Sequence, residues 1–402
     1  MVGTLGGALA VVAACGSDGG SSAAPDGGID ASTPPIDTGT PPPDAGADAE
    51  DPRCAMQAVA LGPHPHATAQ PTPLGRTLAD TRGWHGRLYF AYGDLEANTG
   101  PITISSYDPK TKTWKDHPLA YAADGGSQTA DAFATHVIQR FMPIGDNLWA
   151  AAGQPDFRPF GAAAAPEYAI GTATHDWSEV DIAPDSIHVG DVVARAPNDI
   201  LLGGSIIIPE PDAGPTPGLV ATAAAWRSID GGPFTQIFPV IGSPDGLYDR
   251  SGAWFYGAAL NGIAYLDAES YDYTFDGKTW GGGVTAFGEF LSSQNFAGRL
   301  LFADLGQLYA FDGTKRHNLD FRFFESQGRY QGLTEPLAMF QATEGHLVAV
   351  NVRGDVMMTT DLTTWTCIGK APADASSIGS LDGTLYFGAV EGRVYGFPAP
   401  SW

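Results

Sequence analysis

The sequence is poor in positive charge and in cysteine, and it lacks most of the short motifs that announce a chemistry. It has 21 Lys and Arg residues against 45 Asp and Glu residues, a formal net charge of −24, and three cysteines. Phosphate recognition needs clustered basic side chains, so this balance argues against nucleic acid or anionic lipid headgroups as partners. The motifs GxSxG, HExxH, the P-loop, GxGxxG before a helix and CxxCH are all missing. Nothing indicates a nucleotide or haem cofactor.

Long hydrophobic runs are also scarce, and the one near the start is short. Residues 5–14 read "LGGALAVVAA", about the length of the apolar core of a signal peptide. The run ends in Val12-Ala13-Ala14-Cys15, which resembles the lipobox of bacterial lipoproteins. The resemblance implies cleavage before Cys15, a diacylglycerol on its thiol and an extracytoplasmic, membrane-anchored protein. No basic residue precedes Cys15, which departs from that family's pattern and leaves open whether Met1 is the true start.

The next segment predicts a tether. Residues 16–52 are almost entirely Gly, Ser, Ala, Asp, Thr and Pro, with no basic residue. Such a stretch cannot bury enough apolar surface to offset the entropy of ordering, so we expect it to be disordered. The expected organisation is a signal peptide at 1–14, a lipidated cysteine and linker at 15–52, and a folded domain at 53–402. Gly16 after Cys15 favours the outer membrane.

The folded part keeps an acidic balance and two cysteines. Eight of the 45 acidic residues and none of the basic ones precede Arg53, which leaves 37 acids against 21 bases, a formal charge of −16. Cys54 opens this part and Cys367 lies near its end. In an oxidising compartment they can form one disulfide that clasps the termini of a closed fold, and the alternative is two buried thiols.

Glycine and aromatic residues are abundant, and they recur in a pattern of a turn followed by a strand. The seven stretches with this pattern are "HGRLYFAYGD" (85–94), "GDNLWAAAGQ" (145–154), "PNDILLGGSI" (197–206), "SGAWFYGAAL" (251–260), "AGRLLFADLG" (297–306), "EGHLVAVNVR" (344–353) and "DGTLYFGAVE" (382–391). Their starts lie roughly 38 to 60 residues apart, as in four-stranded propeller blades. We therefore predict an all-β fold, a β-propeller of seven blades, with six or eight left open. The last blade lacks a strand, which residues 55–62 can supply.

A second repeat places an aspartate turn before an aromatic residue. It occurs as "YDPKTKTW" (107–114), "HDW" (175–177), "SIDGGPF" (228–234), "FDGKTW" (275–280) and "TDLTTW" (361–366). The aspartate side chain can accept turn N–H groups, and the aromatic ring can pack between sheets. "SIDGGPF" and "TDLTTW" resemble the Asp-box hairpin of sialidase-like propellers, and the protein resembles secreted bacterial propeller proteins. That hairpin is a folding element and implies no catalysis.

Two histidines are expected near the centre of the ring. His136 and His188 are one blade period apart, and each precedes a valine. With Asp191 and Glu289 they offer the ligand types of a divalent metal site for Zn, Mn or Ca. Two alternatives remain open: histidines that hydrogen-bond neighbouring blades, or a sugar or peptide pocket without metal.

The first blade is unusually polar. Asp80 and Asp94 can act as a general acid and a nucleophile or base in glycoside hydrolysis. In the simpler interpretation Asp94 caps a turn and Asp80 pairs with Arg82. The expected binding residues around the channel mouth are Arg76, Trp84, Tyr92, Asp156 and Arg158.

These observations favour a monomeric, envelope-anchored propeller that binds a glycan or a protein partner over its channel face. The alternatives are a carbohydrate-active enzyme and an inert envelope scaffold. The enzyme is either a hydrolase using Asp80 and Asp94 or a metal-assisted lyase using His136 and His188. The sequence does not decide whether the protein is an enzyme.

Overall fold

The computed structural model describes residues 52–94, 97–123, 126–152, 168–180, 186–209, 219–238, 255–268, 271–282, 289–304, 306–323, 338–343 and 345–397. All of them belong to the compact unit Ala49–Trp402. The predicted signal peptide, the lipidated Cys15 and the tether lie outside the described residues. Within these ranges no helix has the length and apolar character needed to cross a bilayer.

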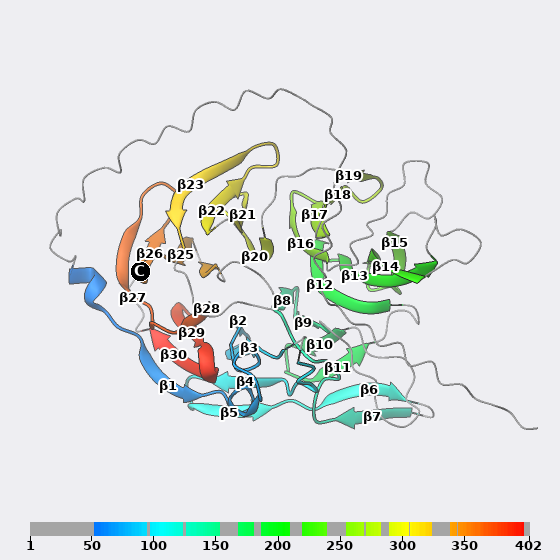
Figure 1. Ribbon diagram of the computed structural model, residues 1–402, viewed down its shortest axis with the longest axis horizontal. Helices are drawn as coiled ribbons and strands as arrows, with labels where there is room; N and C mark the ends of the chain where they lie inside the picture. The colour runs from blue at the N-terminus through cyan, green and yellow to red at the C-terminus, as the bar shows by residue number, and fades with distance from the viewer. Residues whose placement is uncertain are drawn as a thin grey trace, which may run out of the picture. The chain divides into compact units, whose positions relative to one another are not determined.

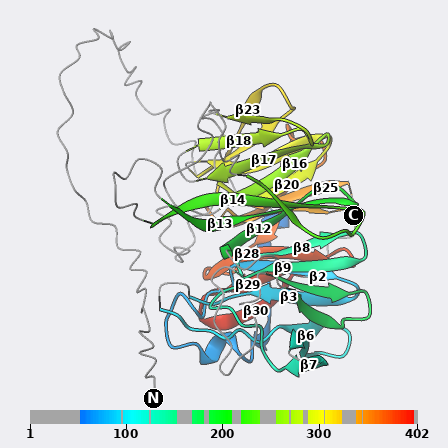
Figure 2. The ribbon, with the colours of Figure 1, turned by 90° about the vertical axis from the view of Figure 1, so that its right-hand side faces the viewer.

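Seven sheets make up the described part of this unit, and they form a seven-bladed β-propeller (Figure 1). The first strand of each blade packs against the first strand of the next, except that β12 of blade 3 packs against β9, the second strand of blade 2. The first strand of blade 1 packs against that of blade 7, so the ring closes. Figure 2 shows the same sheets from the side. The predicted all-β class and the count of seven blades are confirmed.

Blades 1 to 3 occupy the first half of the described chain. Blade 1 contains β2 (Asp80–Trp84), β3 (Arg87–Ala91), β4 (Ser105–Asp108) and β5 (Thr113–Asp116). Blade 2 contains β8 (Phe141–Ile144), β9 (Asn147–Ala151), β10 (Tyr168–Thr172) and β11 (Trp177–Val180), extended by β6 (Leu119–Ala123) and β7 (Gly126–Ala130). Blade 3 contains β12 (Ser186–Ala196), β13 (Asp199–Pro209), β14 (Leu219–Ile229) and β15 (Thr235–Phe238). The β6–β7 hairpin joins blade 2 through a parallel pairing with β11.

Blades 4 to 6 each follow the simple four-stranded plan. Blade 4 contains β16 (Phe255–Leu260), β17 (Ile263–Ala268), β18 (Tyr271–Phe275) and β19 (Trp280–Gly282). Blade 5 contains β20 (Glu289–Phe296), β21 (Arg299–Asp304), β22 (Gln307–Phe311) and β23 (Arg316–Arg322). Blade 6 contains β24 (Phe340–Thr343), β25 (His346–Val350), β26 (Asp355–Thr359) and β27 (Thr366–Lys370).

Blade 7 joins the two ends of the described chain. Its strands are β28 (Ala375–Leu381), β29 (Thr384–Ala389), β30 (Arg393–Phe397) and, from the N-terminal side, β1 (Val59–Pro63). β1 pairs antiparallel with β30, so the strand expected from residues 55–62 does complete this sheet. Two short 3₁₀ turns lie beside it, η2 (Ala67–Ala69) and η3 (Val390–Gly392).

A disulfide between Cys54 and Cys367 fastens this closure, with the two Cα atoms 5.5 Å apart. Cys54 lies in η1 (Pro52–Ala55), and Cys367 lies on β27 of blade 6. The Lys370 N–H also donates to the Met56 carbonyl at 2.8 Å. The N-terminal segment is therefore tied to blade 6 before it becomes the outer strand of blade 7.

Tight turns between the first and second strands explain the repeat seen in the sequence. In blade 4 the turn is Asn261–Gly262, and both residues have positive φ, as two-residue hairpins with the twist of β-strands require. The quoted stretch 251–260 therefore contains the inner strand β16 rather than a turn and second strand. The second strands, such as β25, are buried on both faces because sheets pack on either side.

The aspartate turns lie between the third and fourth strands. Asp108, Asp276 and Asp361 each accept backbone N–H groups two and three residues ahead, at 2.7–3.2 Å. Asp312 does the same with Thr314 and Lys315, a turn that the sequence repeat did not include. These bonds hold the pKa of Asp276 at about 2 and lower the pKa values of the other three.

Candidate functional site

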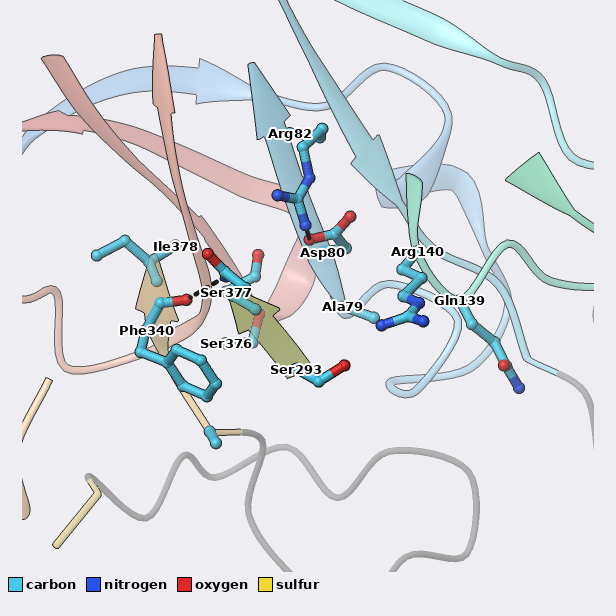
Figure 3. A pocket seen from close by; sticks show the side chains of 12 residues that line it. Ala79, Asp80, Arg82, Gln139, Arg140, Ser293, Phe340, Ser376, Ser377 and Ile378 are labelled. Atoms are coloured by element: carbon cyan, nitrogen blue, oxygen red, sulfur yellow. Dashed lines mark hydrogen bonds and ion pairs between the residues drawn. The ribbon is translucent and has the colours of Figure 1, made fainter. Parts of the chain in front are cut away.

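Among the described residues, side chains from five blades meet at the axis of the propeller. A cavity of about 30 Å³ remains there, lined by residues of blades 1, 2, 5, 6 and 7 (Figure 3). The polar side chains that line it are Asp80, Arg82, Gln139, Arg140, Ser293, Gln294, Ser376 and Ser377. That volume holds one or two water molecules and is far below the several hundred Å³ of a small-molecule site. A sugar ring or a peptide does not fit into this cavity.

A buried ion pair occupies the side of the axis next to blade 3. The Arg140 guanidinium donates to both carboxylate oxygens of Asp191, with 2.7 Å between Nε and Oδ1. Their side chains are 5% and 2% exposed. Burial raises the pKa of Asp191, while the Arg140 charge and the Gly257 N–H act in the opposite direction. Asp191, expected as a metal ligand, is thus engaged by an arginine.

Gly257 completes this contact from blade 4. Its N–H donates to Asp191 Oδ2 at 2.9 Å, and its carbonyl accepts from Arg140 at 2.7 Å. A Cβ at this position would lie 2.6 Å from Val193 Cγ2, so only glycine lets β16 approach so closely. One ion pair therefore joins blades 2, 3 and 4 at the axis.

Of the other three residues in the predicted metal set, the structure describes the side chain of His136. His136 precedes β8, and its Nδ1 accepts from the Gly100 N–H at 3.1 Å, against blade 1. His188 and Glu289 lie on β12 and β20, but their side chains are outside the described residues.

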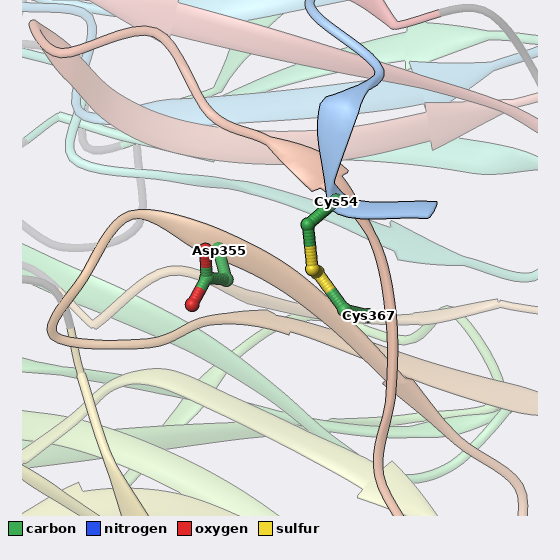
Figure 4. Close-up of side chains that lie close together, drawn as sticks. All are labelled: Cys54, Asp355 and Cys367. Carbon is green, nitrogen blue, oxygen red and sulfur yellow. A yellow bond between two sulfur atoms is a disulfide. The ribbon is translucent and has the colours of Figure 1, made fainter. Parts of the chain in front are cut away.

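In the described part of the chain, the cluster of potential metal ligands is Cys54, Asp355 and Cys367 (Figure 4). Both of these sulfur atoms belong to the disulfide, so they are not available as thiolate ligands.

The two expected catalytic carboxylates have separate partners. Asp80 faces the axial cavity, accepts from the Phe141 N–H at 2.9 Å and lies 3.5 Å from Arg82 (Figure 3). Asp94 is 4% exposed and accepts from Thr72 Oγ1 at 2.6 Å and from the Ala97 N–H at 3.1 Å. Each carboxylate therefore has the structural contacts of the simpler interpretation. No described cavity of substrate size adjoins either of them.

The expected binding residues of blade 1 are also engaged. Arg76 forms an ion pair with Glu391 and donates to the Gln70 carbonyl. Trp84 is 6% exposed, between the His85 and His175 rings, and Tyr92 is 1% exposed. Stacking on a sugar needs a free ring face, which these two side chains do not present. Asp156 and Arg158 lie outside the described residues.

Two serine–histidine pairs were not anticipated from the sequence. His64 Nδ1 accepts from the Ala67 N–H, so Nε2 carries the proton and donates to Ser105 Oγ at 3.0 Å. His117 has the opposite tautomer, because its Nδ1 faces the His175 carbonyl, and Nε2 accepts from Ser106 Oγ at 2.8 Å.

The second pair has the bond that activates a nucleophilic serine, but it lacks access. Ser106 and His117 are 0% and 1% exposed. Burial lowers the pKa of His64 to about 3 and that of His117 to about 4. His64 is therefore a neutral structural group between blades 7 and 1, and His117 is one between blades 1 and 2.

An open cleft lies between blades 2 and 3, away from the axis. Its volume is about 560 Å³, within the range of ligand-binding pockets. The lining residues are Asn147, Trp149, Tyr168, Ile170, Val180, Pro197, Asn198, Ile200, Ser228, Gly231, Gly232, Pro233 and Phe234. We call this the 2–3 cleft. Its walls come from the "GDNLW" hairpin of blade 2 and the "SIDGGPF" turn of blade 3, which sequence patterns identify only as folding elements.

Three aromatic rings form one side of the 2–3 cleft. Trp149 and Tyr168 stack with centroids 5.0 Å apart, and Phe234 meets both edge-on at 6.3 and 5.6 Å. Trp149 and Tyr168 are 6% and 4% exposed, whereas Phe234, Ile170 and Val180 are half-buried. None of the described residues that line the cleft carries a charge.

The chain matches no family model and no curated protein. It is similar in structure to YCF48 bound to a D1 peptide, with 12% identity, a TM-score of 0.44 and coverage of 86% of this chain and 96% of that one. It is also similar to BamB from Moraxella catarrhalis, with 11% identity, a TM-score of 0.40 and coverage of 81% and 84%. The computationally designed protein Ika8 is another such structure, with 13% identity, a TM-score of 0.41 and coverage of 85% and 99%. Likeness at this level carries no argument about function.

Proposed function

We propose that this protein is a binding module that presents its propeller to a protein partner at the bacterial cell envelope. One observation carries the proposal: the described cavity at the axis measures about 30 Å³, whereas the rim has an open cleft of about 560 Å³. Binding sites commonly lie on surface loops held by a rigid scaffold. We therefore place the proposed binding site on the surface of the blades and not over the channel face.

A protein partner fits the described surface better than a glycan does. The rings that the sequence offered for sugar stacking, Trp84 and Tyr92, are buried. The candidate carboxylates Asp80 and Asp94 have structural partners. A neutral, partly apolar cleft suits a side chain of another protein.

Anchoring through Cys15 is part of the proposal and rests on the lipobox resemblance alone. The test is metabolic labelling of the full chain with a radioactive fatty acid, beside Cys15→Ala. We expect label and membrane association in the unchanged chain and neither in the variant. Equal labelling of both chains, or of neither, would overturn the anchor.

Partner binding is tested by photo-crosslinking in the source cells. The photoreactive residue p-benzoylphenylalanine replaces Pro233 at the 2–3 cleft, Val59 on blade 7 or Val352 on blade 6, the last two being 58% and 53% exposed. We expect a discrete crosslinked protein from at least one of these positions. If all three give no protein adduct while the purified chain binds an oligosaccharide array, the protein-partner proposal fails and the glycan reading takes its place.

A further inference from the structure

We propose that the 2–3 cleft binds an extended peptide segment of a protein partner. The peptide inserts one bulky apolar side chain into the cleft and places a neighbouring Lys or Arg at its acidic rim. This inference rests on the proposed function and deepens it by naming the site and the chemistry of the partner.

The size and lining of the cleft suit one large side chain. Phe234, Ile170, Val180 and Ile200 are half-buried and line a space of about 560 Å³. Burying a leucine- or phenylalanine-sized group against such a surface contributes about 2 kcal/mol. Specificity from one anchor side chain in a pocket is the usual arrangement in peptide recognition.

The same geometry argues against a sugar. Trp149 and Tyr168 stack on each other and are nearly buried, so neither ring offers the free flat face on which a pyranose stacks.

The charge around the cleft favours a basic residue beside the apolar anchor. Asp146 and Asp230 are exposed in the turns immediately before the lining residues Asn147 and Gly231. The described residues of blades 2 and 3 hold three basic side chains, and each of them binds an aspartate: Arg140 with Asp191, and Arg195 and Arg227 with Asp199. A cation on the peptide therefore meets carboxylates without repulsion from unpaired basic groups in these blades.

The experiment begins with a random dodecapeptide display library selected against the purified full chain. Synthetic versions of the selected peptides are then titrated by fluorescence anisotropy. We expect the selected sequences to share a bulky apolar residue within two positions of a Lys or Arg. Val180→Trp, which fills the cleft from the end of β11, should weaken binding at least tenfold. Val352→Trp makes the same change on blade 6 and should alter affinity less than twofold.

The charge of the rim is tested separately. Asp146→Asn should weaken the selected peptides two- to fivefold at low salt, and the difference should shrink at high salt because exposed charges are screened. Asp320→Asn, an exposed aspartate on β23 of blade 5, should leave affinity unchanged. Equal losses in both variants would show a general effect of net charge and overturn the role of the rim.

The outcomes separate this inference from the proposed function. Failure to select peptides, or binding that Val180→Trp leaves intact, overturns the cleft as a peptide site. If crosslinks at Val59 or Val352 persist in that case, the protein still binds a partner, but elsewhere. An oligosaccharide that binds the chain and is lost in Val180→Trp would keep the cleft as a site and overturn the peptide class.

Discussion

The axis and the 2–3 cleft use opposite chemistry. The described side chains at the axis are largely charged or amide groups, and they bind one another and the backbones of neighbouring blades. Neutral and aromatic residues line the cleft and leave it open. The charged residues that the sequence offers as catalytic or metal-binding candidates thus hold the blades together. The cleft that can accept a ligand is formed by neutral residues that belong to no recognisable functional motif.

The largest expected effect comes from breaking the axial ion pair. Arg140→Met leaves the Asp191 carboxylate buried without its cation, and loss of one member of a buried pair costs about 3–5 kcal/mol. Urea unfolding of the purified chain measures this. The double variant Arg140→Met, Asp191→Leu should regain much of the stability, because no charge then remains buried. Equal losses in the single and double variants would show that packing, not charge, matters here.

The disulfide should come next. Serine at both Cys54 and Cys367 removes the bond that ties the N-terminal segment to blade 6. Loss of a native disulfide typically costs about 2–5 kcal/mol. We expect a lower urea midpoint in the variant, and the same shift when the unchanged chain is reduced with dithiothreitol. A variant as stable as the oxidised protein would mean that the β1–β30 pairing alone closes the ring.

Acid should weaken the interface between blades 7 and 1, where His64 lies. The pKa of His64 is lowered from 6.5 to about 3 in the folded chain, so its stabilising effect is complete above pH 6.5 and is lost as the pH falls towards 3. Between pH 7 and pH 5 this one histidine lowers the free energy of unfolding by about 2 kcal/mol.

Urea unfolding at the two pH values tests that slope. His64→Gln should lose less stability on acidification than the unchanged chain, whatever its stability at pH 7. His346→Gln, a half-buried histidine at the start of β25, is the control for titration elsewhere. An unchanged slope in His64→Gln would rule out a lowered pKa for His64.

The sequence predicts the fold well because its signals are local and repeated. Two-residue turns such as Asn261–Gly262 and aspartate turns such as Asp276 occur at blade intervals, and each one specifies a hairpin. Even the closing strand could be predicted, since the last blade is one strand short. For blade 4 the repeat was assigned to residues 251–260, which hold the first strand β16 and not a turn and second strand. The predicted position of that hairpin was therefore wrong, although the predicted number of blades was right.

The candidate site could not be predicted in the same way. Whether Asp191 binds a metal or Arg140 depends on residues 51 positions apart, and no local pattern reveals that contact. Trp84 and Tyr92 look like binding residues until the neighbouring blade covers them. The 2–3 cleft results from how two blades pack, so Val180 and Phe234 carry no signal of it in the sequence.

The smallest expected effect on the free energy of unfolding is that of Val180→Trp, and the same substitution at Val192 is its comparison. Val192 is 1% exposed in the packed core of blade 3, and an added indole there forces neighbours apart at a cost of about 1–3 kcal/mol or more. Val180 borders the open cleft, so Val180→Trp should change the free energy of unfolding by less than about 0.5 kcal/mol. Urea unfolding of both variants decides the point. If Val180→Trp destabilises as much as Val192→Trp, the space between blades 2 and 3 is not open in solution. Near-neutral stability would instead leave a folded protein whose cleft is filled, which is the variant that the peptide titration requires.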